Sequence, residues 1–115
     1  MRYKLYLDDL RYPDYHEDWR IARNYHDALW WVKTYGLPYH ISFDHDLGNE
    51  DNTPPWHDCP NEFTGYDFAK WFCDYVLDNQ LDLPEDFSYN VHSANPVGAE
   101  NIRSYMANFM KDGYV

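Results

Sequence analysis

The sequence has little cysteine, little glycine and few basic residues, and each shortage excludes a class of protein. Its 115 residues include 2 cysteines and 5 glycines, without the spacing of a disulfide framework, a zinc ribbon or a glycine-rich phosphate loop. We therefore interpret Cys59 and Cys73 as reduced thiols. The chain has only 9 basic residues against 20 acidic ones, which gives a net charge of -11. This balance disfavours binding to duplex nucleic acid or to an anionic membrane surface.

Long apolar runs are also missing, which disfavours a signal peptide and a membrane-spanning segment. We expect a cytoplasmic protein, in the host cytoplasm if the source is a phage. The sequence is nevertheless 44% hydrophobic and 20% aromatic, which argues against disorder. A chain of this length can bury a core without disulfides or structural metals, so we predict one domain spanning residues 1–115.

A strand over residues 39–43 organises this prediction. Apolar and polar residues alternate there with a period of two, which is typical of a half-buried strand. The strand runs directly into Asp44-His45-Asp46, and Gly48 permits a sharp turn after them. Acidic residues at the carboxyl end of a strand occupy the edge where open α/β sheets bind ligands.

Further strands and helices follow from the same patterns. Two more strands with the same alternation end in polar residues: residues 3–7 run into Asp8-Asp9, and residues 87–91 run into His92-Ser93. A short strand is also predicted over residues 19–23. Capping residues and apolar spacing predict helices that begin after Asn24, Thr64 and Asn95, and the last helix is predicted to end near Gly113. One face of the second helix is predicted to face the core, and its residues are Phe68, Ala69, Phe72, Cys73, Val76 and Leu77. Residues 49–63 are predicted to form a long loop.

Strands that alternate with helices predict right-handed crossovers and a mostly parallel sheet with helices on its faces, a small three-layer α/β fold. Because neighbouring strands lie about 4.8 Å apart, the polar residues after three strands can converge if those strands are adjacent. The converging groups would be Asp8/Asp9, Asp44/Asp46 and His92/Ser93.

Carboxylates gathered in this way favour a divalent cation. Mg²⁺ and Mn²⁺ take oxygen ligands, commonly one or two carboxylates with water and phosphate. We predict a Mg²⁺ or Mn²⁺ site made by Asp8, Asp9 and Asp44, with Asp46 beside them. The alternative is that some of these acids cap a loop or pair with an arginine such as Arg11.

Two histidines at the same edge are candidates for proton transfer, because imidazole titrates near neutral pH. His92 is the stronger catalytic candidate, with His45 and Asp44 in support. The alternative for a histidine at a strand end is a purely structural hydrogen bond. Phosphate binding is predicted at Arg11, Ser93, Asn95 and the N-terminus of the last helix. The alternative for Arg11 is a salt bridge to a neighbouring aspartate.

Acids after a first and a central strand resemble the receiver domains of two-component signalling. Those receivers carry a lysine after a late strand, whereas the lysines here stand inside a predicted strand or on helices, which disfavours a phospho-acceptor role. A resemblance over almost the whole chain is carried by four motifs in order: Leu7-Asp8-Asp9-Leu10-Arg11-Tyr12-Pro13, Ser42-Phe43-Asp44-His45-Asp46-Leu47-Gly48, Thr64-Gly65-Tyr66-Asp67 and His92-Ser93-Ala94-Asn95-Pro96-Val97-Gly98. With these motifs the chain resembles the cyclic-phosphate processing receiver-like domains of bacterial and phage proteins.

This resemblance implies a receiver-like (flavodoxin-like) fold that acts on nucleotides containing a cyclic phosphate. It places Asp8, Asp9 and Asp44 in an acidic pocket with His45 and Asp46 beside it, and it places His92, Ser93 and Asn95 opposite. We therefore expect a metal-dependent phosphoesterase whose substrate is a small nucleotide or an RNA end with a cyclic phosphate. The alternative is a non-catalytic module that sequesters a nucleotide signal or presents its acidic surface to a protein partner.

Overall fold

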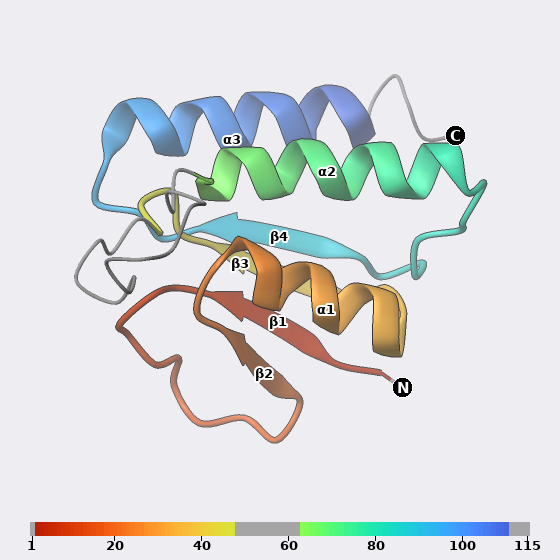
Figure 1. The fold of residues 1–115 in the computed structure, drawn as a ribbon, viewed down its shortest axis with the longest axis horizontal. Coiled ribbons are helices and arrows are strands. Elements are labelled where there is room, and N and C mark those ends of the chain that lie inside the picture. The colour runs from red at the N-terminus through yellow and green to blue at the C-terminus, as the bar shows by residue number, and fades with distance from the viewer. Residues whose placement is uncertain (1, 48–62, 111–115) are drawn as a thin grey trace, which may run out of the picture.

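The computed structural model describes residues 2–47 and 63–110 as four short strands and three helices (Figure 1). The elements follow one another as β1 (Lys4–Leu7), β2 (Trp19–Ala22), α1 (Tyr25–Tyr35), β3 (His40–Phe43), α2 (Gly65–Asp78), β4 (Ser88–Val91) and α3 (Pro96–Asn108). Each strand predicted from alternating residues is present. No helix in the described part of the chain is long and apolar enough to cross a membrane.

The four strands form one parallel sheet in the order β2-β1-β3-β4. All four arrows in Figure 1 therefore point to the same edge. Leu7 pairs with Phe43, and Phe43 pairs with Val91, so these three strands end at one level of the sheet. The residues that follow them consequently emerge side by side, as the sequence predicted.

The three helices pack on one face of the sheet. α1 contacts β1, β2 and α2, α2 contacts α3, and α3 contacts β4. Buried residues of all three helices join Leu5, Leu7, Ile41 and Phe43 of the sheet in one apolar core. The receiver-like α/β fold is thus confirmed, with a layering that differs from the expected helices on both faces.

Topology explains this layering. Both crossovers that contain a helix, β2 to β3 and β3 to β4, move across the sheet in the same direction. Right-handed crossovers in one direction place their helices on one face. The β1 to β2 connection runs the other way, but residues 8–18 carry no helix. The opposite face, which we call the open face, therefore lacks a helical cover among the described residues.

Local sequence signals fix the helix ends. The side chain of Asn24 accepts a hydrogen bond from the Asp27 N–H, and α1 ends at Gly36, whose φ of 91° suits glycine. Thr64 and Asp67 form the expected capping box of α2. Asn95 caps α3.

One residue of the second helix departs from the predicted pattern, and the predicted end of the last helix lies outside the described residues. Leu77, expected on the core-facing side of α2, is 46% exposed. It is the second-last residue of α2, beyond the stretch that packs against the sheet and α3. The predicted end of the last helix near Gly113 lies outside the described residues, as do Cys59 and residues 48–62 of the predicted long loop.

Candidate functional site

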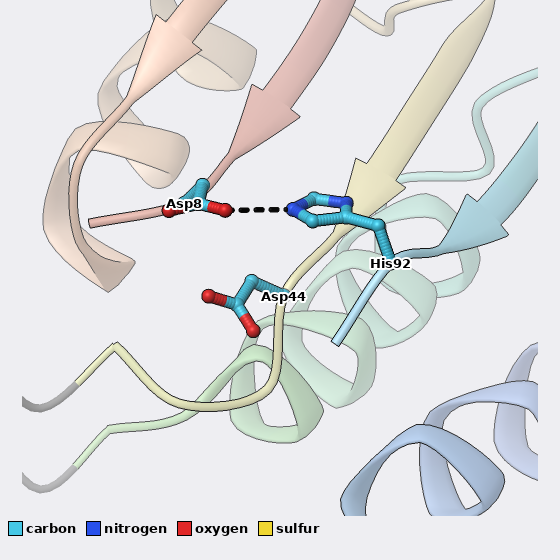
Figure 2. A group of neighbouring side chains, drawn as sticks. All are labelled: Asp8, Asp44 and His92. Atoms are coloured by element: carbon cyan, nitrogen blue, oxygen red, sulfur yellow. Dashed lines mark hydrogen bonds and ion pairs between the residues drawn. The ribbon is translucent and has the colours of Figure 1, made fainter. Parts of the chain in front are cut away.

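Three side chains from three strand ends meet at the carboxyl edge of the sheet. Asp8 follows β1, Asp44 follows β3 and His92 follows β4, and Figure 2 shows Asp8 and His92 turned toward each other with Asp44 drawn below them. One ligand atom of each residue lies within 4.8 Å of the others. Asp8 is 1% exposed and Asp44 is 5% exposed. Two buried carboxylates and an imidazole therefore share one small volume.

The carboxylate of Asp8 is held by four donors. Its Oδ1 accepts hydrogen bonds from the backbone N–H groups of Leu10 and Arg11, both at 2.8 Å. Its Oδ2 accepts from Arg11 Nε at 2.7 Å and from His92 Nε2 at 2.9 Å. Burial acts to raise the pKa of Asp8, but these hydrogen bonds outweigh it and lower the pKa below its usual value. Asp8 is therefore a stable anion at neutral pH.

A chain of hydrogen bonds crosses the open face from His40 to His92 and continues to Asp8. His40 Nε2 lies 2.6 Å from Asn90 Oδ1, Asn90 Nδ2 donates to Ser42 Oγ at 2.9 Å, and Ser42 Oγ lies 2.7 Å from His92 Nδ1. Because the ionised Asp8 only accepts, His92 Nε2 carries a proton, and when the ring is neutral its Nδ1 accepts from the Ser42 hydroxyl. All four bonds then run in one direction, from His40 to Asp8.

An aromatic stack sets the plane of the His92 ring. Tyr6 lies parallel to the imidazole, with a centroid distance of 4.7 Å and an interplanar angle of 5°. Trp19 packs edge-on against Tyr6 in turn. Sequence reasoning did not assign roles to Tyr6, Ser42 or Asn90, although strand alternation places all three on the face away from the core. This alternation was the sequence signal that could have pointed to the three residues.

Arg11 lies across the two buried acids. Its Nε bonds Asp8, and its Nη2 is 3.6 Å from Asp44 Oδ2. Its own backbone carbonyl and that of Asp8 accept hydrogen bonds from Arg23 Nη1, at 2.7 and 3.1 Å. The guanidinium of Arg11 is half exposed. The salt bridge considered as an alternative for Arg11 is therefore present. About half of the Arg11 side chain nevertheless remains exposed to solvent.

Asp9 stands next to this group but is not part of it. It is half-buried, and burial together with the negative charges of Asp44 and Asp8 raises its pKa. A cation at the site would relieve that repulsion. Asp9 is therefore a candidate for an additional ligand, and its pKa depends on the charges of Asp44 and Asp8.

Asp46 belongs to a separate cluster with His45 and Asn95. Its Oδ1 lies 2.8 Å from His45 Nδ1 and accepts from Asn95 Nδ2 at 3.3 Å. The hydrogen bond from His45 is the main reason that the pKa of Asp46 is lowered. The side chain of Asp46 is 64% exposed. Asp46 thus orients His45 and is outside the Asp8, Asp44 and His92 group.

Two glycines allow the helices to approach the strand ends closely. A Cβ at residue 98 would lie 2.3 Å from His45 Cγ, so the imidazole packs directly on the first turn of α3. A Cβ at residue 65 would lie 1.8 Å from the carbonyl oxygen of Asp44, and the Gly65 N–H donates to the His45 carbonyl at 2.9 Å. These contacts give a physical reason for the glycines in the Thr64-Gly65 and Val97-Gly98 motifs.

Ser93 and Asn95, predicted to bind phosphate, are engaged in starting α3. Ser93 Oγ accepts from the Asn95 N–H at 3.1 Å, and Asn95 Oδ1 accepts from the Gly98 N–H at 3.0 Å. The Asn95 carbonyl accepts from the Ala99 N–H at 2.8 Å, and Pro96 has no N–H to offer. Of the predicted phosphate ligands, Arg11 is the one that lies at the acidic group.

Comparison with known proteins identifies a family. The family model for the cyclic-phosphate processing Receiver domain matches residues 3–108. Nothing matches among the curated proteins, and nothing matches among the solved structures. The matched range contains every strand and helix described above and every residue of the candidate site.

Proposed function

The chain belongs to the cyclic-phosphate processing Receiver domain family, and from this premise we propose that it is a metal-dependent phosphoesterase that opens a cyclic phosphate on a nucleotide or an RNA end. The observation that supports this proposal is the group made by Asp8, Asp44 and His92, whose ligand atoms lie within 4.8 Å of one another. Its place at the carboxyl edge of a parallel sheet is where such folds bind their ligands.

The donor atoms of this group suit a divalent ion. Asp8 and Asp44 offer carboxylate oxygens, which Mg²⁺ and Mn²⁺ prefer, and Asp9 is close enough for its pKa to respond to both charges. When bound, the ion would neutralise phosphate charge and lower the pKa of a bound water. Asp46 contacts His45 and Asn95 instead, so its role as a ligand stays a prediction.

His92 would move a proton in the hydrolysis. Opening a cyclic phosphate forms a bond from a water oxygen to phosphorus and breaks the bond from phosphorus to one ribose oxygen. The imidazole would gain a proton at Nδ1 from the Ser42 hydroxyl, which would take the proton released by water, and the same path in reverse would return the proton to the departing ribose oxygen. Tyr6 and Ser42 hold the ring in place for both transfers. Asp8 at Nε2 stabilises the charged imidazolium between them.

Arg11 would bind the phosphate itself. Its guanidinium is half exposed and lies between Asp8 and Asp44. A planar guanidinium matches two phosphate oxygens, and a cation among the carboxylates would release it from them. Arg11 would then exchange a carboxylate partner for the phosphate of the substrate.

The test combines binding and turnover. Thermal unfolding is followed with Mg²⁺, Mn²⁺ and Ca²⁺, alone and with nucleoside 2′,3′-cyclic phosphates, and product formation is followed by chromatography. We expect metal and nucleotide to raise the Tm of wild type and not of Asp44→Asn, since a ligand stabilises only the state that binds it. Asp86→Asn is the matched control, because Asp86 is an exposed acid paired with Arg2 away from the site. Full activity in folded Asp44→Asn and His92→Ala variants would contradict the proposal.

A non-catalytic binding module is the second candidate, and the position of Arg11 favours it. The guanidinium already lies against both buried carboxylates, so the acids have a cationic partner without any metal. Such a module would return its nucleotide chemically unchanged after denaturation. Recovery of an opened monoester in amounts beyond one per protein would instead identify an enzyme.

A further inference from the structure

The open face of the sheet carries a hollow beside the candidate site. It has a volume of about 560 Å³ and lies between the sheet and the segment of residues 12–16. We call it the sheet-face hollow. On the sheet side its lining includes Lys4, Tyr6 and Trp19, and on the segment side it includes Tyr12 and Tyr15. Its volume is in the range of pockets that bind small organic ligands, about 300–1,000 Å³.

The sheet-face hollow and the candidate site share a wall. His92 and Ser42 line the hollow, and His92 also bonds Asp8 at the strand ends. The ring of Tyr6, stacked on His92, leads from the site into the hollow. A ligand with its phosphate at Asp8, Asp44 and His92 therefore has this space within reach of its remaining atoms.

Aromatic side chains give the hollow the character of a base-binding platform. Tyr12 is 74% exposed and Tyr15 is 94% exposed, so both side chains are accessible to a ligand. On the sheet, Trp19 carries the Lys4 ammonium 4.3 Å from its ring centroid. Aromatic residues on the bare face of a sheet are a recurring means of stacking nucleic-acid bases.

The hollow also offers charged groups at its edges. Lys4 presents an ammonium donor and Asp14 a carboxylate acceptor, both among the lining residues. Nucleobases carry donors and acceptors around a flat apolar ring. The hollow therefore combines aromatic stacking surfaces with several polar side chains, and this combination matches the flat ring and the polar edge of a nucleobase.

We propose that the sheet-face hollow binds the base of a nucleotide whose cyclic phosphate lies at Asp8, Asp44 and His92. The substrate is then a single nucleoside cyclic phosphate or the terminal nucleotide of an RNA. The phosphate half of this proposal rests on the proposed function, whereas the base half does not.

Equilibrium dialysis tests the two halves separately. The probes are the four nucleosides without phosphate, the four nucleoside 2′,3′-cyclic phosphates, and methyl riboside 2,3-cyclic phosphate, which lacks a base. We expect at least one nucleotide to bind about tenfold more tightly than the base-free compound, and the same nucleoside to bind without phosphate. Tyr15→Ala and Trp19→Leu should each weaken that binding about 5- to 160-fold, the range expected for loss of one stacking partner.

Tyr15→Ala is the more informative variant because Tyr15 is almost fully exposed and its loss leaves the core untouched. Trp30→Ala is the matched control, since Trp30 is a 52% exposed aromatic on α1, on the helical face. Its nucleotide affinity should equal that of wild type.

The outcomes separate this inference from the proposed function. If no nucleoside or nucleotide binds better than the base-free compound, the sheet-face hollow does not bind bases, even where the base-free cyclic phosphate is opened. If nucleosides bind through Tyr15 and Trp19 but no cyclic phosphate is opened, the sheet-face hollow is a base-binding site and the phosphoesterase proposal fails. An oligonucleotide with a terminal cyclic phosphate that binds more tightly than the mononucleotide identifies an RNA end as the source, and equal or weaker binding identifies the free nucleotide.

Discussion

The Asp8 carboxylate accepts a hydrogen bond from His92 Nε2 at 2.9 Å although β3 lies between their two strands. The two residues are 84 positions apart in the sequence. Their contact spans the sheet because Leu7, Phe43 and Val91 are in register, so the residues that follow leave the sheet at one level. Asp44, between them, completes the group (Figure 2). The candidate site is thus a direct product of parallel strand register.

Replacement of Asp8 by asparagine should destabilise the fold. Each carboxylate oxygen of Asp8 accepts two hydrogen bonds, so an amide NH₂ in either orientation faces two donors with no acceptor. An unsatisfied buried group costs about 1–3 kcal/mol. We expect a loss of this size in the free energy of unfolding, measured by urea denaturation at neutral pH.

The control for this experiment is Asp86→Asn, which removes an exposed carboxylate that pairs with Arg2. Exposed ion pairs contribute little, so this variant should unfold close to wild type. Equal stability of Asp8→Asn and wild type would show that the buried hydrogen bonds of Asp8 do not support the strand ends.

Much of the fold follows from short-range sequence signals. Asn24, Thr64 and Asn95 cap their helices as predicted because each side chain accepts a hydrogen bond from a backbone N–H three residues on. The convergence of Asp8 and Asp44 with His92 also follows, since parallel strands end at a common edge. These features depend on spacing along the chain or on strand direction alone.

Other features depend on arrangements that spacing does not encode. Asp46 follows Asp44 by two residues, yet it turns to His45 and Asn95 because of the backbone path after β3. Alternation placed Tyr6 and Ser42 away from the core, but their contact with His92 required knowledge of strand order. The single helical layer likewise depends on the direction of each crossover across the sheet.

Replacement of Gly65 and Gly98 by alanine should separate an effect on stability from an effect on the geometry of the site. A Cβ at residue 65 meets the backbone of Asp44, which cannot yield without moving the strand end, so Gly65→Ala should cost about 1–3 kcal/mol. A Cβ at residue 98 meets the His45 ring, which can rotate away. Gly98→Ala should therefore be closer to wild type in stability while displacing His45.

Urea denaturation measures the stability of both glycine variants, and the imidazole signals of His45 in NMR spectra report its position. Loss of turnover in Gly98→Ala with metal binding intact would assign His45 a part in the reaction. Unchanged His45 signals would contradict the contact between its ring and α3.

Cys73 should be inert in the native protein. Its side chain is buried in the core, its Sγ lies 3.7 Å from Met106 Sδ, and burial raises the pKa of its thiol to about 12. A Cys59→Ser variant leaves Cys73 as the one thiol of the chain. We expect no reaction with a thiol-specific disulfide reagent at pH 8 and one equivalent after unfolding in urea. Reaction at the rate of a small free thiol would show that the core around α2 and α3 opens readily.

His40 should make the folded state less stable in mild acid. Burial is the main cause that lowers the pKa of His40 below its usual value of about 6.5. The unfolded chain then binds a proton at a higher pH than the folded chain, so the free energy of unfolding falls as pH decreases through 6.5. The neutral ring is the one that accepts from Ser88 and donates to Asn90.

A His40→Gln variant isolates this contribution, because glutamine offers one donor and one acceptor without titrating. The two proteins differ only at residue 40, so the difference between the two stability profiles from pH 7.5 to 5 reports the replacement of His40. We expect wild type to lose more stability than His40→Gln over this range. Parallel profiles would mean that folding leaves the pKa of His40 unchanged, which would contradict a pKa lowered by burial.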